Sequence, residues 1–187
     1  KRLMDLLVSC IGLIILSPLL IFSCLAIVLE SGFPLFFKQK RSGYLGRPYN
    51  LYKLRTMKPD SEKDGAQWAT QGDDRVTIVG RFLRRLRIDE IPQFWNVIKG
   101  EMSVVGPRPE RPELEEEIVK KLPYWNCRYL LKPGITGWAQ IKYRYASDIE
   151  SSEEKLSYDL FYVKNASFLL DLEIILSTLR SLMKGSR

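Results

Sequence analysis

The sequence predicts an α+β fold that is mainly helical and is joined to an N-terminal membrane helix. Three observations predict it: a long uncharged apolar run, two short strand-like segments around a glycine-containing loop, and several later segments with helical periodicity. At 187 residues the chain is long enough for one domain and too short for two of ordinary size. Its 45% apolar and 27% charged residues exclude a disordered chain and a polytopic membrane protein.

The first element is an apolar segment, residues 6–29, that contains no charge. As one helix it would be about 36 Å long, which is enough to cross the hydrocarbon core of a bilayer. It is long for a secretory signal peptide and ends at Glu30 without a small-residue cleavage pattern. Pro18 cannot bind the Ile14 carbonyl, so we expect a kink or break there, with the Ser17 hydroxyl available to satisfy a freed carbonyl.

Two membrane geometries fit this segment. A kinked helix can span the bilayer, or a helix can enter, bend at Ser17-Pro18 and leave on the same side. Lys1 and Arg2 precede the segment, and Lys38 and further cations follow it, so both ends favour the cytoplasmic face. A re-entrant helix places both basic ends on the cytoplasmic face, whereas a membrane-spanning helix places only one of them there. The residues alone leave both geometries open.

The next elements are two short strands. Residues 34–41 and 49–57 are rich in aromatic and apolar residues, and the glycines and proline of residues 42–48 predict a hairpin loop between them. Residues 58–75 are polar and predict a loop. Helices are predicted at residues 76–87, 90–99, 111–122, 152–162 and 167–184. The last is strongly amphipathic, which fits either a core position or the membrane interface.

The composition restricts the chemistry. The chain has no histidine, which excludes Ser-His-Asp and Cys-His nucleophiles, histidine-bearing zinc sites and imidazole acid–base catalysis. Its three cysteines are too few for a Cys-only zinc site and too scattered for a disulfide framework, which favours a reducing, cytosol-facing environment. No P-loop or G-x-G-x-x-G pattern occurs.

Positive charge is concentrated just after the apolar segment. The formal net charge is +7, and residues 31–87 hold 13 basic and 5 acidic residues, whereas residues 88–187 hold 14 and 15. Such a field attracts anions, whether phosphorylated ligands, lipid headgroups or nucleic acid. Charge alone is equally typical of a solvated basic surface.

Asp89 and Glu90 are the first candidates for catalysis. Pro92 fits only the first turn of a helix, so Asp89 is expected as the N-cap and Glu90 as the first helical residue. Two carboxylates at a helix start, beside Arg84 and its neighbours, also form a site for phosphate chemistry, because the cations keep Asp89 ionised. An ionised carboxylate can attack phosphorus or bind Mg²⁺. Taken alone, the pattern favours the cap.

Basic residues in three other motifs can hold phosphates. A Pro-Arg-Pro motif fixes the backbone around Arg108, which suits bidentate contact with a phosphate. Lys53 and Arg55 share one face of the second predicted strand by its two-residue period. Residues 132–140 form a Pro-Gly turn that enters a short apolar strand, with Arg144 beyond it. Taken singly, each motif also fits a turn or a salt-bridge partner.

In this order the motifs resemble the bacterial sugar transferases, also called monotopic phosphoglycosyl transferases. The resemblance covers essentially the whole chain and rests on the apolar segment with Ser17-Pro18 and on YKLRTM, RIDEIPQFWNVIKGEMSVVGPRP, KPGITGWAQI and DLFYVKNASFLLDLEIILSTL. It implies transfer of a sugar 1-phosphate from a UDP-sugar to polyprenyl (undecaprenyl) phosphate, with release of UMP. This reaction begins the synthesis of capsule, O-antigen or exopolysaccharide.

The resemblance also implies roles for single residues. In the Asp89-Glu90 pair, Asp89 is the implied nucleophile, which forms a covalent aspartyl-phosphosugar intermediate, and the implied ligand of a required Mg²⁺. Substrate-binding cations are implied at Lys53, Arg55, Arg84, Arg108 and Arg144. Many small family members carry Asn-Gly-Arg after the WAQ sequence, whereas residues 141–143 precede Arg144 here, so the resemblance leaves the sugar preference open.

The family's Ser-Pro break implies a re-entrant helix that is broken at Ser17-Pro18. Residues 1–30 are then the membrane anchor, and residues 31–187 form a catalytic domain on the cytoplasmic face of the bacterial inner membrane, as one structural unit with the anchor. The implied partners are the UDP-sugar, polyprenyl phosphate and membrane lipids; nucleic acid is not expected, and a homodimer stays open. The main alternative is a non-catalytic membrane-bound protein that binds anionic lipid through residues 31–87.

Overall fold

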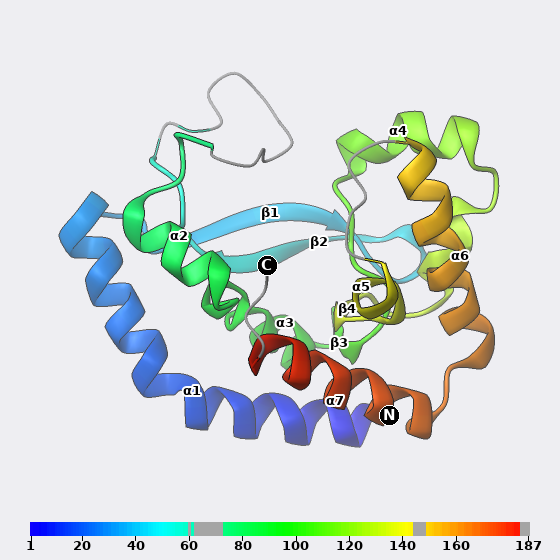
Figure 1. Cartoon of the computed structure of the whole chain (residues 1–187), viewed down its shortest axis with the longest axis horizontal. Helices are drawn as coiled ribbons and strands as arrows, with labels where there is room; N and C mark the ends of the chain where they lie inside the picture. Colours follow the sequence, from blue (N-terminus) through cyan, green and yellow to red (C-terminus); the bar gives the residue numbers. More distant parts are fainter. Residues whose placement is uncertain (60, 62–72, 144–148, 184–187) are drawn as a thin grey trace.

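The structure is a computed structural model that describes residues 1–59, 61, 73–143 and 149–183. Helices dominate, as predicted, with an antiparallel and a parallel pair of short strands among them (Figure 1). The elements are, in chain order, α1 (Arg2–Ser31), β1 (Phe36–Ser42), η1 (Tyr44–Gly46), β2 (Pro48–Leu54), α2 (Ile78–Arg85), η2 (Ile88–Glu90), α3 (Gln93–Lys99), β3 (Ser103–Val105), α4 (Pro112–Lys121), η3 (Trp125–Leu130), β4 (Gly134–Thr136), α5 (Trp138–Lys142), α6 (Ile149–Asn165) and α7 (Phe168–Met183).

The apolar segment forms α1, which continues through Pro18 without an interruption. Figure 1 shows that the helix bends, because its two halves run in different directions. Proline inside a helix is the ordinary cause of such a bend. The Ser17 hydroxyl donates to the Ile14 carbonyl over 2.8 Å, which confirms that serine satisfies the carbonyl left free by Pro18. Of the described helices, α1 alone is long and apolar enough to cross a membrane.

The predicted hairpin is confirmed as the antiparallel pair β1 and β2. Phe37 lies opposite Lys53, and Arg41 lies opposite Tyr49. Exposure alternates along β1, so that one set of side chains faces solvent and the set containing Phe37 and Arg41 is partly buried. Opposite residues of an antiparallel pair point to the same face, and therefore Lys53 and Arg41 both lie on the inner face of the hairpin.

The start of helix α2 is fixed by Thr77, which precedes it, and by the chain that follows β2. Thr77 caps it by accepting the Gly80 N–H over 2.9 Å. A Cβ at Gly80 would lie 2.1 Å from the Thr56 carbonyl oxygen, so the helix approaches the chain after β2 as closely as only glycine permits. Helix α3 follows at Gln93–Lys99, three residues later than the predicted start at residue 90.

The parallel pair of β3 and β4 was not predicted. Ser103 pairs with Gly134, and Val105 pairs with Thr136. Strand β4 falls within residues 132–140, which were predicted as a Pro-Gly turn that enters a short strand, but the chain then turns into helix α5 instead of staying extended. The β3–β4 pair places the Pro-Arg-Pro motif directly after β3.

Helix α1 shares a core with the rest of the chain and also presents a large exposed apolar surface. Ile27 is buried with Leu54, Leu83 and Ile88, which belong to β2, α2 and η2. Exposed apolar side chains are frequent on α1 and α7: Leu3, Leu7, Ile11, Ile14, Ile15, Ile21, Phe22, Leu25, Leu29, Phe168, Leu169, Leu172, Leu176 and Leu179. Exposing so much apolar surface to water is unfavourable. Such a surface is typical of a protein that contacts a membrane or a partner there.

Candidate active site

Asp89 and Glu90 lie in the single turn η2 between α2 and α3. Arg87 starts this turn in the left-handed conformation (φ 58°, ψ 20°), which is uncommon for a residue other than glycine or asparagine. The prediction that Asp89 caps a helix is wrong. Asp89 lies inside the turn η2, which Arg87 precedes, whereas α3 begins only after Pro92, and neither element has a side-chain cap.

Glu90 is held in place by cations. One carboxylate oxygen, Oε1, accepts from Lys53 Nζ and from Arg108 Nη2, each over 2.9 Å. Arg87 Nη1 lies 3.7 Å from the other oxygen. Burial alone raises the pKa of Glu90, but the three cations hold that pKa well below its ordinary value. Glu90 is therefore ionised and fixes Lys53 and Arg108 beside the dyad.

Asp89 is buried, and none of the residues that the structure describes pairs with its carboxylate. It is 7% exposed, and among the described residues no group makes a hydrogen bond or an ion pair with its carboxylate. Burial raises the pKa of Asp89, against the opposing effect of Lys53 and Arg84. A carboxylate that is desolvated, unpaired and surrounded by cations is available for reaction or for a metal.

The two remaining described cations differ in where they point. Arg84 Nε donates to the Thr56 hydroxyl over 2.7 Å, and its charge acts on Asp89, so it lies near the dyad. Arg55 instead donates to the carbonyls of Ser31 and Gly32, over 3.0 and 2.7 Å, at the end of α1. The structure thus gives Arg55 a role in fixing α1, and its implied contact with substrate stays a prediction. Arg144 lies outside the described residues.

The residues present fit a weakly held Mg²⁺ ion but not a closed metal cage. Within residues 1–59, 61, 73–143 and 149–183, no group of three or more acidic, cysteine or histidine side chains could hold a metal. Glu90 is already bound by cations. Mg²⁺ is often bound through one carboxylate together with water and substrate phosphates, and the unpaired Asp89 fits that mode.

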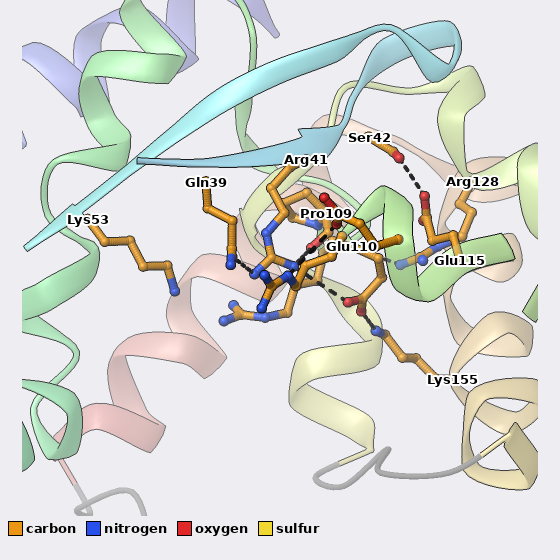
Figure 2. A network of polar contacts seen from close by, with 12 residues as sticks. Gln39, Arg41, Ser42, Lys53, Pro109, Glu110, Glu115, Arg128 and Lys155 are labelled. Carbon is orange, nitrogen blue, oxygen red and sulfur yellow. Dashed lines mark hydrogen bonds and ion pairs between the residues drawn. The ribbon is translucent and has the colours of Figure 1, made fainter. Parts of the chain in front are cut away.

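A second polar network lies behind the Pro-Arg-Pro motif, and Figure 2 shows Arg41 and Lys155 reaching Glu110 within it. Lys155 of α6 forms an ion pair with Glu110, and Arg41 Nη1 lies 3.7 Å from its other oxygen. Burial raises the pKa of Glu110, but Lys155, Arg128 and Arg41 hold it below the ordinary value of a glutamate. The network links β1, α6 and the chain before α4.

This lowered pKa predicts an effect of pH on stability. A glutamate with a depressed pKa in the folded state stabilises the protein above its unfolded pKa of about 4.3, and the contribution is lost as the pH falls through the folded pKa. Glu110→Gln should therefore lose less unfolding free energy between pH 6 and 3 than the parent. Urea unfolding in detergent at a series of pH values measures this unfolding free energy. Exposed Glu117→Gln is the control, and parallel curves for parent and Glu110→Gln would contradict the prediction.

Sequence reasoning missed two arginines near the site, Arg41 and Arg128, whereas Arg87 was among the cations expected beside the dyad and lies 3.7 Å from Glu90. The position of Arg41 could have been found, because the hairpin register puts it on the same face as Lys53. Arg87 directly precedes the dyad turn, but its left-handed backbone has no signature in the sequence. Arg128 lies in η3, and no local pattern links it to Arg108.

Cations around an unpaired carboxylate are typical of proteins that handle anionic phosphorylated compounds, and the long apolar helix α1 is compatible with association with a membrane. Comparison with known proteins narrows this class. The chain belongs to the bacterial sugar transferase family, whose model matches residues 1–185. The resemblance seen in the sequence motifs is thereby confirmed.

Several relatives carry the names of sugar phosphotransferases. The UDP-N-acetylgalactosamine-undecaprenyl-phosphate N-acetylgalactosaminephosphotransferase of Aeromonas hydrophila is 43% identical over 185 residues. The UDP-glucose:undecaprenyl-phosphate glucose-1-phosphate transferases of Klebsiella pneumoniae and Caulobacter vibrioides are 43% and 39% identical over 180 and 185 residues. The first two relatives use different sugars at the same identity, so identity alone assigns no sugar to this chain.

The relatives differ in how much of their own length is matched. The alignments cover 99%, 95% and 98% of this chain in the order given above. They cover 44%, 39% and 69% of the Aeromonas, Klebsiella and Caulobacter proteins. The chain thus spans less than half the length of the first two relatives.

Proposed function

We propose that this chain is a phosphoglycosyl transferase that moves a sugar 1-phosphate from a UDP-sugar to undecaprenyl phosphate and releases UMP. Family membership and the names of the relatives support the general reaction. The observation in this chain that carries the proposal is the contrast within the dyad. Glu90 is fixed by two cations at 2.9 Å, while its neighbour Asp89 is buried and has no partner among the described residues.

Asp89 is the proposed nucleophile. Its carboxylate oxygen attacks the phosphorus that carries the sugar, the bond from this phosphorus to the bridging oxygen breaks, and UMP leaves with the electron pair. A phosphate oxygen of undecaprenyl phosphate then attacks the same phosphorus, and the bond to Asp89 breaks to restore the carboxylate. The covalent intermediate divides one difficult step into two and lets UMP leave before the lipid acceptor reacts.

Fixed cations make this attack electrostatically feasible. A carboxylate and a diphosphate repel each other, so positive charge must already be in place when they meet. Glu90 holds Lys53 and Arg108 beside the dyad, and Arg84 is held by Thr56. Mg²⁺, when bound by Asp89, would supply further charge neutralisation at the diphosphate. Arg144 is a further proposed contact for the donor.

We propose further that α1 is re-entrant, and contacts at its N-terminal end support this. Arg2 donates to the carbonyls of Val97 and Ile98 at the end of α3, over 2.6 and 2.8 Å. The buried carboxylate of Asp5 accepts the N–H of Val104 over 2.9 Å. This end of α1 is thus bound to α3 and β3.

The C-terminal end of α1 is bound to the same body. Arg55 binds the carbonyls of Ser31 and Gly32, and the Glu30 carboxylate accepts the Ile78 N–H at the start of α2 over 2.7 Å. A bilayer core of about 30 Å cannot separate two ends that bind one folded unit. These contacts favour the re-entrant geometry over the span and, with the basic flanks, a monotopic protein on the cytoplasmic face.

This topology makes a testable prediction. With Cys10, Cys24 and Cys127 replaced, single cysteines at Lys1 and Lys38 place one thiol before and one after α1, and both parent residues are exposed and charged. Both thiols should react with a membrane-impermeant maleimide in inverted inner-membrane vesicles, and neither should react in intact spheroplasts. Labelling of the two ends from opposite sides would contradict the re-entrant geometry and favour a span.

The activity itself is tested with the 187-residue chain in nanodiscs, undecaprenyl phosphate, Mg²⁺ and a panel of UDP-sugars. We expect UMP release and a lipid-linked sugar product with at least one donor. If the protein binds anionic vesicles but no donor on a broad panel yields UMP, the lipid-binding alternative is favoured instead. Omission of Mg²⁺ is expected to abolish UMP release, and full activity without Mg²⁺ would contradict the proposed role of the metal.

A further inference from the structure

The backbone of the Pro-Arg-Pro motif is held at every carbonyl from residue 107 to residue 110. The Pro107 and Glu110 carbonyls accept backbone N–H groups of Gly134 and Ser42, over 2.9 and 3.1 Å. The two carbonyls between them accept from side chains: that of Pro109 from Arg41 Nη1 over 3.2 Å, and that of Arg108 from Arg128 Nη2 over 2.7 Å. The donors come from β4, β1 and η3, so the motif cannot shift without breaking contacts to several elements.

Arg128 is an unusual donor because it is a buried charge. It is 1% exposed, its guanidinium carbon lies 4.2 Å from the centre of the Trp125 ring, and its Nη2 lies 2.7 Å from Asp159 Oδ2 on α6. Asp159 is also 1% exposed. Figure 2 shows the Arg128 side chain within the polar network behind the motif.

Such a pair is poorly explained by stability alone. Desolvation of two charges offsets much of their attraction, and apolar residues of the same volume often stabilise a core equally well or better. What the pair does provide is direction, since a guanidinium fixed by a carboxylate and an aromatic ring presents one N–H at a defined point. That point is the Arg108 carbonyl.

Arg108 in turn connects this buried pair to the dyad. Its backbone carbonyl is bound by Arg128, and its side chain binds Glu90 Oε1 over 2.9 Å. Arg128 itself has no contact with Asp89 or Glu90 among the described hydrogen bonds and ion pairs. The contact that links Arg128 most directly to the dyad is therefore the one through Arg108.

We propose that Arg128, oriented by Asp159, is a positioning residue that sets the place of the Arg108 guanidinium for the transfer reaction. The inference rests on the proposed function and adds to it a pair of residues from η3 and α6 that lie outside the dyad. Misplacement of a charged group by about 1 Å is enough to lower a catalytic rate by up to about 100-fold.

A double-mutant cycle tests this inference. UMP release is measured in nanodiscs for the parent, Arg128→Met, Arg108→Met and the double variant, with kcat and KM for the UDP-sugar determined separately. We expect Arg128→Met to lower kcat/KM by about 10- to 100-fold in the parent and by less than about twofold when Arg108 is already replaced. Independent, multiplying effects would overturn the proposal.

Two further variants separate positioning from a general loss of stability. Asp159→Asn keeps the volume of the side chain and can be measured even if Arg128→Met does not fold. It should lower kcat/KM less than Arg128→Met does, and this loss should again disappear when Arg108 is already replaced. Tyr162→Phe, which removes a buried hydrogen bond of 2.6 Å to Asp171, should lower the melting temperature but change kcat/KM by less than about twofold. If the parent releases UMP and Asp159→Asn changes kcat/KM as little as Tyr162→Phe does, the positioning role of Arg128 and Asp159 is wrong. If the parent itself releases no UMP, the proposed function fails as well.

Discussion

Asp89→Asn is expected to lower UMP release by about 10³-fold or more, because an amide cannot serve as the attacking oxygen. The same change should not destabilise the protein. Burial raises the pKa of Asp89, so the ionised form is disfavoured in the folded state and a neutral amide removes that cost. We therefore expect an inactive variant with a melting temperature at or above that of the parent.

The measurement pairs a UMP-release assay with thermal unfolding in detergent. Asp74→Asn is the matched control, because Asp74 is an exposed aspartate outside the dyad, and it should keep the parental rate. Parental UMP release by Asp89→Asn would exclude Asp89 as the nucleophile. A large drop in melting temperature would show instead that Asp89 has a structural partner.

Glu90→Gln should have the opposite effect on stability. Its carboxylate is the shared partner of Lys53 and Arg108, and removing the charge leaves two cations close together and partly buried. Loss of one partner from a buried ion pair costs 3–5 kcal/mol when burial is complete; for these partly exposed cations we expect about 2–3 kcal/mol. The melting temperature should fall by roughly 5–10 °C.

Activity should fall with it, by about 100-fold, because the two cations are no longer held where the diphosphate binds. Glu113→Gln, at a glutamate whose side chain is 59% exposed, is the control and should change neither property. Equal melting temperatures for the parent and Glu90→Gln would contradict the role of Glu90 as the anchor of Lys53 and Arg108. The two dyad variants are thus separated by the sign of their effect on stability.

Sequence patterns predicted the elements whose signals are local. The last helix was expected at residues 167–184 and is α7, Phe168–Met183, because its apolar residues recur with helical spacing along its 16 residues. The hairpin was expected from two aromatic-rich segments around a Gly/Pro-containing loop. A short strand was expected within residues 132–140, where β4 lies, but β3 and its pairing with β4 were missed, because β3 has only three residues and is specified by its partner more than by its own sequence.

The site was only partly predictable for the same reason. Lys53 was predicted as a phosphate-binding cation, and the structure places it against Glu90. Arg55 was expected on the same face by a two-residue period, but that period ends where β2 ends, at Leu54. One residue later, the Arg55 side chain turns to the end of α1, a contact that depends on the tertiary fold. The link from Arg128 to Arg108 likewise joins η3 to the chain after β3 and has no local pattern.

The covalent intermediate on Asp89 is the central claim, and intact-protein mass spectrometry tests it most directly. The chain is mixed with a productive UDP-sugar and Mg²⁺ in the absence of undecaprenyl phosphate, quenched within one turnover, and digested to locate any modification. We expect an added mass of one sugar phosphate, located on Asp89 and lost when the lipid acceptor is supplied. Accumulation of lipid-linked product with no added mass on Asp89 at any quench time would contradict it.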